Sequence, residues 1–289
     1  MSIDEAGDIH IWTARPQEVE PAQWPQLTAW LDEPERLCAE KFRHVDDRHA
    51  YTLAHALRRL AVATALAMPP ASLVFSSEPS GKPILTTPPD QALYFSHAHS
   101  RTLVACAVTR IGTVGIDTEP LDQDHADMAL LRGLVALPDA QQRRTTPCSH
   151  STPQFFFYWT LLEAYWKSRG RGLSLDHPML HCQPISEGWF EVSTSQADAD
   201  VHDGQGEATW ATALQGPPDC MLMLAVTPIQ APAVRSPLRL AYHTPIFEPA
   251  FAPVFAAQDI SQQKTHPSQL PYAPASPASG MQAAICVSA

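Results

Sequence analysis

Residues 155–170 read Phe-Phe-Phe-Tyr-Trp-Thr-Leu-Leu-Glu-Ala-Tyr-Trp-Lys-Ser-Arg-Gly. This run predicts a long helix over about residues 153–169, with Gly170 at the position where a helix commonly ends in glycine. The helix is apolar nearly all round, so we expect it to be largely buried. It carries a single carboxylate, Glu163, and a buried carboxylate is costly unless it is paired or binds a cation.

A predicted strand upstream supplies two more carboxylates. Asp117 and Glu119 are two residues apart in the run 114–120, Val-Gly-Ile-Asp-Thr-Glu-Pro, so their side chains point to the same face. Glu163 and Lys167 are four apart on the helix and also share a face. Three hard oxygen donors suit Mg²⁺, whereas zinc prefers histidine or cysteine ligands. A solvated strand end and an exposed Glu163–Lys167 ion pair are the alternative interpretations.

The rest of the body predicts a mixed α and β fold. Residues 9–12 resemble a first strand, residues 47–68 a long amphipathic helix, and residues 92–119 a set of antiparallel strands. Each half of the body then holds one long helix beside strands. This arrangement hints at a duplicated α+β unit, although no sequence repeat is visible.

Charge and composition exclude several classes of function. The 289 residues include 30 acidic and 19 basic side chains, for a net charge of −11, which argues against nucleic-acid binding and against docking on anionic membranes. No apolar run reaches the roughly 18 residues that a membrane span needs. The acidic start lacks the features of a signal peptide, and the six cysteines lack metal-ligand spacing, so we expect free thiols in the cytoplasm.

Proline enrichment marks the end of the chain. Ten of the 28 prolines fall after residue 227, so residues 231–289 are predicted to form a Pro-rich, largely disordered tail. An apolar cluster near residues 246–255 is the exception and could anchor the tail to the body. The expected organisation is an N-terminal α+β half at 1–110, a C-terminal α+β half with the metal site at 111–230, and the tail.

Signatures of the best-marked enzyme classes are missing. The sequence has no P-loop, no Gly-x-Gly-x-x-Gly, no Gly-x-Ser-x-Gly and no His-Glu-x-x-His. Basic side chains in the first half have two interpretations: ordinary surface charges, or clamps on a phosphorylated ligand. They are Lys41, Arg43, Arg48, Arg58, Arg59 and Lys82, with His99 nearby.

Six stretches in a fixed order point to one family. They are residues 47–59, 81–85 (Gly-Lys-Pro-Ile-Leu), 95–100 (Phe-Ser-His-Ala-His-Ser), 114–120, 159–167 and 169–175. Their order and the 41 residues between Asp117 and Trp159 resemble the 4′-phosphopantetheinyl transferases of the long, surfactin-synthetase-activating type. The resemblance covers roughly residues 9–225.

The resemblance implies a fold and a reaction. The expected fold is α+β, with two similar α+β halves in a pseudo-twofold arrangement and coenzyme A between them. The expected reaction moves the phosphopantetheine arm of coenzyme A to a serine of an acyl or peptidyl carrier protein and releases 3′,5′-ADP. Because one chain completes the cleft, a monomer is expected.

The resemblance also assigns roles to residues. By position, Asp117, Glu119 and Glu163 match the Mg²⁺ ligands of the family. Glu163 further matches the general base, and Lys167 matches a lysine near the reacting phosphate. The expected coenzyme A contacts are Lys82 and Pro83 of the Gly-Lys-Pro turn, His99, Arg48 and Lys41.

Three positions depart from the family pattern: Leu162 replaces a lysine, Ala50 an arginine and Ala98 a serine. Loss of these polar groups motivates a first alternative, a degenerate member that binds coenzyme A or a carrier protein without catalysis. A second alternative is a zinc hydrolase built on His97 and His99 with Asp117.

Overall fold

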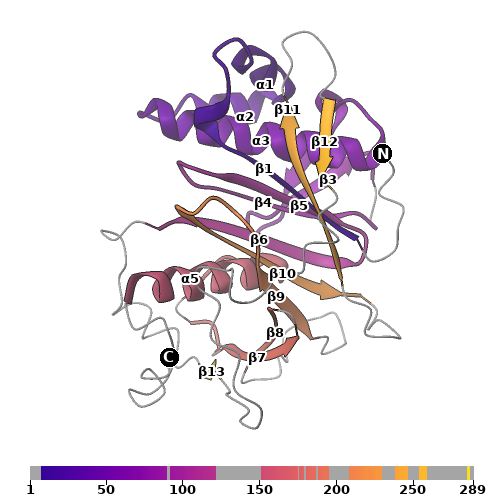
Figure 1. Cartoon of the computed structure of the whole chain (residues 1–289). Coiled ribbons are helices and arrows are strands. Elements are labelled where there is room, and N and C mark those ends of the chain that lie inside the picture. Colours follow the sequence, from indigo (N-terminus) through magenta and orange to yellow (C-terminus); the bar gives the residue numbers. More distant parts are fainter. Residues whose placement is uncertain are drawn as a thin grey trace.

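The structure is a computed structural model that describes residues 8–89, 92–121, 151–174, 176–178, 180–186, 188–194, 208–229, 238–246, 254–258 and 285–286. Two β-sheets pack face to face, and one long helix covers the outer face of each (Figure 1). The helix α3 (Val45–Leu66) lies on the first sheet, and α5 (Ser151–Ser168) lies on the second. The predicted α+β fold of two similar halves is confirmed.

The first sheet has the strand order β12-β11-β1-β5-β4. Its strands are β1 (Asp8–Ala14), β4 (Tyr94–His99), β5 (Val104–Thr109), β11 (Arg239–Ile246) and β12 (Val254–Gln258). A separate hairpin joins β2 (Val74–Ser77) to β3 (Pro83–Thr87). The strands predicted at 9–12 and within 92–119 correspond to β1, β4, β5 and the next strand, β6 (Gly112–Pro120).

The second sheet has the order β13-β7-β8-β9-β10-β6. Its strands are β6 (Gly112–Pro120), β7 (Leu180–Ser186), β8 (Trp189–Thr194), β9 (Thr209–Ala213), β10 (Cys220–Pro228) and β13 (Ile285–Cys286). The chain therefore passes from the first sheet to the second between β5 and β6.

Short helices precede α3 in the first half. They are the 3₁₀ turn η1 (Pro16–Glu18), α1 (Trp24–Trp30) and α2 (Glu33–Ala39), and a further 3₁₀ turn, η2 (Pro70–Ser72), follows α3. Asp32 and Glu35 form a capping box that starts α2, because each side chain accepts a bond from the other residue's backbone N–H. The helix α3 ends at Ala67, whose φ of 52° is left-handed.

Strand alternation divides the apolar side chains among three cores. In β10 the residues Met221 and Met223 face α5, whereas Leu222 and Leu224 face the first sheet. The central core between the sheets is built from β1, β5, β6 and β10, with members such as Ile9, Ile11, Ala105, Ala107, Val114, Ile116 and Val226. Because both halves contribute to this core, they form one packed body.

A glycine lets α5 approach β6 very closely. A Cβ atom on Gly115 would lie 2.0 Å from the carbonyl oxygen of Ala164 and 2.5 Å from the amide nitrogen of Ser168. Only glycine permits this backbone contact. The contact fixes α5 directly over the strand that carries Asp117 and Glu119.

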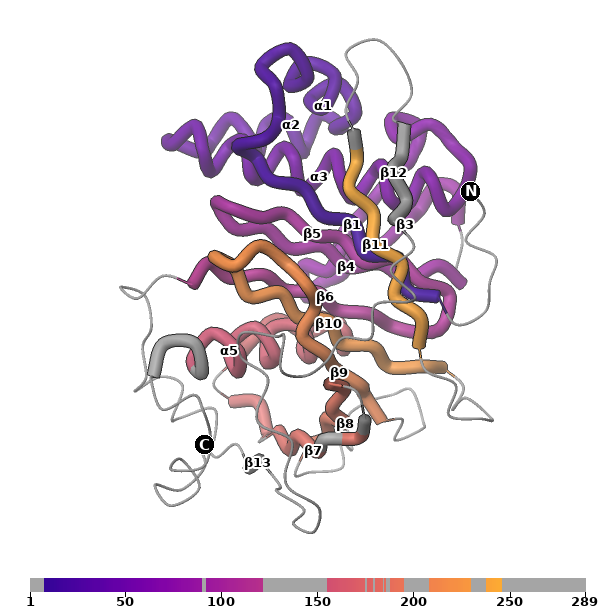
Figure 2. Tube along the Cα trace, viewed as in Figure 1, coloured from indigo at the N-terminus to yellow at the C-terminus, as the bar shows by residue number. Residues whose placement is uncertain are grey.

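Strands β11, β12 and β13 all lie within residues 231–289, the range predicted to form a largely disordered tail. Strand β11 pairs in parallel with β1, so that residues from opposite ends of the chain lie side by side (Figure 2). No local pattern in the sequence predicts β11. The apolar cluster near residues 246–255 falls largely outside the described residues. None of the helices in the described ranges has the length and apolarity needed to cross a bilayer.

Candidate functional site

The three predicted carboxylates gather where β6 lies under α5. Asp117 and Glu119 alternate with buried residues of the central core, so they face α5 together with Gly115. Glu163 projects from α5, one turn before Lys167. We call Asp117, Glu119 and Glu163 the acidic cluster. Its members interact electrostatically with one another and with Lys167.

Asp117 is the most buried member of the acidic cluster, with 5% of its surface exposed. Its Oδ1 atom accepts a bond from the Lys167 ammonium at 2.6 Å. Its Oδ2 atom is buried and has no hydrogen-bond partner in the described part of the structure. An orphaned buried carboxylate oxygen is uncommon, and such atoms often mark the place of a missing ion or water.

Glu119 lies at the more open end of β6. It accepts a bond from the indole Nε1–H of Trp159 at 3.0 Å. Burial, with the negative charge of Asp117 second, raises the pKa of Glu119 to about 7, although the Trp159 bond and Lys167 act in the other direction. The carboxylate therefore lacks enough positive charge around it.

Glu163 and Lys167 respond to the same crowding of charge. Burial and Asp117 raise the pKa of Glu163, while Lys167 lowers it. Burial alone would lower the pKa of Lys167, but Asp117, Glu163 and Glu119 together raise it above its ordinary value. Lys167 is thus a charged counter-ion for the whole acidic cluster.

The donor set of the acidic cluster suits a hard divalent cation. Among the described residues, no three His, Cys, Asp or Glu side chains stand in an arrangement that would hold a metal ion without movement. Lys167 occupies Asp117 Oδ1, and Trp159 occupies Glu119 Oε1. However, the free Oδ2 of Asp117 and the raised pKa values of both glutamates show that the cluster would gain from added positive charge. Carboxylate oxygens alone fit Mg²⁺ better than zinc.

Lys82 contacts Lys167, and the charges of Lys167 and Asp117 act on His99. The Lys82 ammonium donates to the backbone carbonyl of Lys167 at 3.1 Å and so links the β2–β3 hairpin to the end of α5. Burial lowers the pKa of Lys82, and Pro83 follows it as the first residue of β3. Burial lowers the pKa of His99, and the positive charges of His55 and Lys167 lower it further.

Lys41 and Arg48 occupy a different setting. Both are exposed, Lys41 just after α2 and Arg48 in the first turns of α3. The contacts described for the structure place neither of them against the acidic cluster. Their predicted role in binding coenzyme A therefore rests on the sequence.

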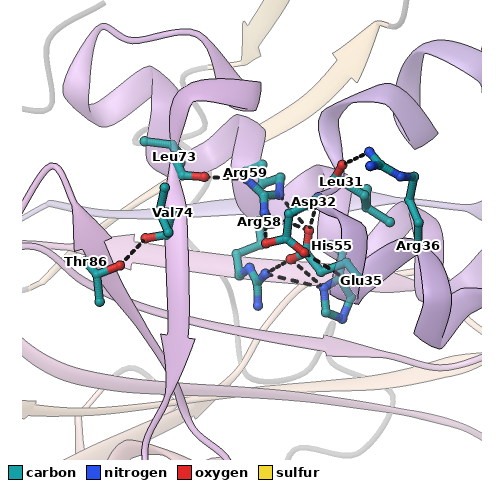
Figure 3. Close-up of polar contacts among 10 residues, drawn as sticks. All are labelled: Leu31, Asp32, Glu35, Arg36, His55, Arg58, Arg59, Leu73, Val74 and Thr86. Atoms are coloured by element: carbon teal, nitrogen blue, oxygen red, sulfur yellow. Dashed lines mark hydrogen bonds and ion pairs between the residues drawn. The ribbon is translucent and has the colours of Figure 1, made fainter.

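Arg58 and Arg59 are neither surface charges nor free clamps. They are 3% and 1% exposed and converge with His55 on Glu35 (Figure 3). Glu35 was not among the residues singled out from the sequence. Arg59 also donates to Asp32 and to the Leu73 carbonyl.

This network ties α2 to α3. Burial would raise the pKa of Glu35, but the bond from His55 and the charges of Arg58 and Arg59 together lower it to about 2. The capping-box pattern Asp32-x-x-Glu35, followed by two arginines inside an apolar helix, is the sequence signal that could have revealed the network.

His97 does not join Asp117. Its ring lies 5.3 Å from the ring of His55, edge to face, on the α3 side of the first sheet, whereas Asp117 faces α5 on the second sheet. The arrangement gives no support to a zinc site that shares these two residues.

The three departures from the family pattern are all buried. Ala50, Ala98 and Leu162 are 2%, 6% and 4% exposed, and Leu162 packs in the core around α5. Their side chains fill space in the protein interior and do not line the acidic cluster with charge.

Comparisons with known proteins agree with this architecture. Residues 14–110 match the family model described as 4′-phosphopantetheinyl transferase, N-terminal, and residues 113–215 match the 4′-phosphopantetheinyl transferase superfamily. The boundary between the two matches falls where the chain passes from one sheet to the other.

Individual relatives carry the same family name. The 4′-phosphopantetheinyl transferase HetI of Nostoc is 31% identical over 169 residues, which cover 58% of this chain and 70% of HetI. The 4′-phosphopantetheinyl transferase psf-1 of Bacillus pumilus is 29% identical over 53% of this chain and 63% of its own length. Sfp of Bacillus subtilis is 24% identical over 52% of this chain and 65% of its own length. By its sequence matches and its two-half fold, this chain belongs to the 4′-phosphopantetheinyl transferase superfamily.

Proposed function

We propose that this protein transfers the 4′-phosphopantetheine group of coenzyme A to a serine of an acyl or peptidyl carrier protein, in a reaction that needs Mg²⁺ and releases 3′,5′-ADP. The observation that carries the proposal is the convergence of Asp117, Glu119, Glu163 and Lys167 in one member of this family. Membership in the long, surfactin-synthetase-activating subtype is part of the same proposal.

Asp117, Glu119 and Glu163 would hold the Mg²⁺ ion. When bound, Mg²⁺ neutralises charge on the pyrophosphate of coenzyme A. Asp117 suits this role because its Oδ2 atom lacks a partner among the described residues. Glu119 and Glu163 suit it because a nearby cation would relieve the repulsion and burial that raise their pKa values.

Glu163 would also act as the general base. In the transfer, the serine oxygen bonds to the β-phosphorus, the bond from that phosphorus to the bridging oxygen breaks, and 3′,5′-ADP leaves with the electron pair. The serine proton passes to Glu163, directly or through water. Glu163 suits this role because it lies one turn from Lys167 on the same face of α5, within electrostatic range of Asp117. Lys167 would place its ammonium near the reacting phosphate.

Coenzyme A would lie along the first half, beside Lys82, Pro83 and His99. Lys82 and His99 support this placement because both lie near Lys167. Arg48 and Lys41 would contact the more exposed end of the ligand. Positive side chains of this kind bind phosphate groups through charge-assisted bonds.

The division into two halves, the monomeric state and the cytoplasmic location of the protein belong to the same proposal. The family matches at 14–110 and 113–215 support a boundary near residue 110, and the end of β10 at Pro228 supports one near residue 230. The shared central core supports a monomer, because one chain supplies both halves. The free cysteines Cys38, Cys106, Cys182 and Cys220 suit the reducing cytoplasm. The proposed partners are coenzyme A and a carrier protein, without nucleic acid or membrane.

One experiment tests the proposal directly. The purified protein is incubated with coenzyme A, Mg²⁺ and an apo carrier protein of the fatty-acid, polyketide or peptide type, and the carrier is weighed by intact mass spectrometry. We expect the mass of one phosphopantetheine to be added, and we expect Glu163→Gln to abolish the addition. An unchanged mass for all three carriers would contradict the proposal.

A second candidate function follows from the three buried positions at which the chain departs from the family pattern. Because Ala50, Ala98 and Leu162 add no polar group, the chain could bind coenzyme A or a carrier protein without catalysis. Calorimetric binding of coenzyme A together with no mass gain on any carrier would identify this function.

A further inference from the structure

Strands β4 and β6 lie where the two halves of the protein join. In the described sheets, β4 is the last strand of the first sheet and β6 is the last strand of the second. Strand β4 ends at His99, which the proposed function places beside coenzyme A, and β6 carries Asp117 and Glu119 of the acidic cluster. The relative position of these two strands therefore sets how coenzyme A would meet the carboxylates.

A buried serine bonds the two strands together. Ser96 of β4 is 6% exposed, and its Oγ atom accepts a hydrogen bond from the backbone N–H of Ile116 of β6 at 3.1 Å. Ala98, two residues further along β4, belongs to the central core between the sheets, so Ser96 on the same face also points toward the second sheet. The bond therefore crosses from one half of the protein to the other.

The amide of Ile116 needs this acceptor. Ile116 is fully buried, and a buried N–H group without an acceptor costs free energy comparable to a lost hydrogen bond. Within the described sheet, β6 pairs with β10 along one edge and has no further strand along the other. Ser96 thus supplies, from the first half, an acceptor that a neighbouring strand would otherwise supply.

The bond lies between two contacts of β6 with α5. Gly115, one residue before Ile116, lies against the backbone of α5. Asp117, one residue after Ile116, accepts a bond from Lys167 at 2.6 Å. Because the peptide bond between neighbouring residues is planar and rigid, a shift of Ile116 would also move Asp117. Strand β4 thus holds β6 at the same point where α5 does.

We propose that Ser96 is a positioning residue for the transfer reaction. Its hydroxyl group holds β6 against the first half and so aligns Asp117 and Lys167 with the coenzyme A that the first half binds. The inference rests on the proposed function. In this role Ser96 acts through Ile116 and contacts no reacting atom. Its loss should therefore slow the transfer more than it weakens binding, because a small misplacement of reacting groups raises the barrier.

Initial-rate kinetics of Ser96→Ala tests the proposal. Alanine leaves the Ile116 amide without its acceptor, so we expect kcat to fall about tenfold while the Michaelis constant for coenzyme A changes less than about twofold. Ser96→Thr keeps the acceptor oxygen and should restore most of kcat. If Ser96→Thr fails to fold, Ser96→Asn takes its place, because its amide oxygen is also an acceptor. A rise in the Michaelis constant with normal kcat would overturn the proposal.

Thr209→Val is the matched control. Thr209 of β9 is fully buried, and its hydroxyl group shares a hydrogen bond of 2.8 Å with that of Thr227 of β10. Thr227 lies opposite Thr113, four residues before Asp117 on β6. We expect both Ser96→Ala and Thr209→Val to lower the melting temperature by about 2–4 °C, but Thr209→Val to keep its kcat. An equal fall of kcat in both variants would overturn the proposal, since lost stability would then explain it.

A spectroscopic measurement follows the alignment without turnover. The side-chain ammonium of Lys167, assigned by ¹⁵N NMR with Lys167→Arg as the reference, should exchange its protons slowly because Asp117 holds it. We expect Ser96→Ala to speed this exchange and that of the Ile116 amide, and Thr209→Val to leave both unchanged. Unchanged exchange at Lys167 in Ser96→Ala would overturn the proposal.

The two hypotheses fail separately. If wild type modifies no carrier while the Lys167 signal responds to Ser96→Ala, the transfer reaction is contradicted and the alignment of Asp117 by Ser96 stands. If wild type modifies a carrier and Ser96→Ala matches Thr209→Val in kcat and in proton exchange, the transfer reaction stands and the positioning role is contradicted.

Discussion

At the scale of single residues, the proposed function gives Glu163 two roles, metal ligand and general base. Glu163 lies on the same face of α5 as Lys167 and interacts electrostatically with Asp117. We predict that Glu163→Gln lowers kcat about 10²- to 10⁴-fold, the usual contribution of a general base.

The Michaelis constant for coenzyme A separates the possible roles of Glu163. Glutamine keeps the size of the side chain, so we expect the Michaelis constant for coenzyme A to change little. Initial-rate kinetics over a range of Mg²⁺ concentrations measures both kcat and this constant. Normal turnover at saturating Mg²⁺ would show that Glu163 is neither base nor essential ligand.

At the scale of elements, the Glu35 network decides how α2 docks on α3. Glu35→Gln leaves the buried guanidinium group of Arg58 without a carboxylate and leaves Arg59 with Asp32 alone. Breaking a buried ion pair in this way costs about 3–5 kcal/mol, so we predict a loss of unfolding free energy of that order in urea.

The same network predicts a response to acid. The pKa of Glu35 is about 2 in the folded protein, against an ordinary value of 4.5. A lowered carboxyl pKa contributes stability that is present above about pH 4.5 and is lost as the pH falls toward 2. The unfolding free energies of wild type and Glu35→Gln should therefore converge over this range. If the difference between the two unfolding free energies stays constant over this pH range, the charge of Glu35 is not the source of the stability.

The contact between β6 and α5 is a second feature at this scale. A methyl group at Gly115 would strike the α5 backbone at 2.0 Å, which cannot relax by moving a side chain. We predict that Gly115→Ala costs about 3 kcal/mol or more, measured by thermal unfolding. Gly172→Ala is the control, because no atom lies within 4 Å of its added Cβ. Similar melting temperatures for the two variants would show that α5 is less tightly seated than its backbone contact indicates.

Part of the site could be predicted from local periodicity. The two-residue spacing of Asp117 and Glu119 and the four-residue spacing of Glu163 and Lys167 place each pair on one face. The ion pair between Lys167 and Asp117 joins residues 50 positions apart, so no local pattern indicates it. Strand β11 was missed because the prolines around it, with Pro245 inside the strand, indicated a disordered tail, and because its partner β1 lies far away in the sequence.

At the scale of the whole molecule, a buried pair of histidines joins the two ends of the chain. His10 on β1 and His243 on β11 share a hydrogen bond of 2.9 Å, and His243 stacks on Trp12. Burial, followed by His10, lowers the pKa of His243 to about 4, and burial lowers that of His10 despite the opposing charge of Asp8. Asp8 also pairs with Arg239 at the start of the two strands.

We predict that acid loosens β11. A lowered histidine pKa contributes stability that is present above the ordinary value of 6.5 and is lost as the pH falls toward about 4. Hydrogen exchange of the β11 amides, corrected for intrinsic rates, should lose protection between pH 7.5 and pH 5. His243→Phe keeps an aromatic ring against Trp12 without a titrating group, so its protection should vary less. Equal protection at both pH values in wild type would contradict the prediction.

The parallel pairing of β1 with β11 has a consequence for synthesis on the ribosome. The first strand to emerge must wait for residues 239–246 before its outer edge is covered. During that interval β1 presents an unpaired edge, which other chains can extend into aggregates. Such long-range pairing also slows folding, because distant segments must meet before the sheet is complete. We therefore expect the nascent chain to depend on chaperones until β11 has emerged, and slower translation of the second half to lower its soluble yield.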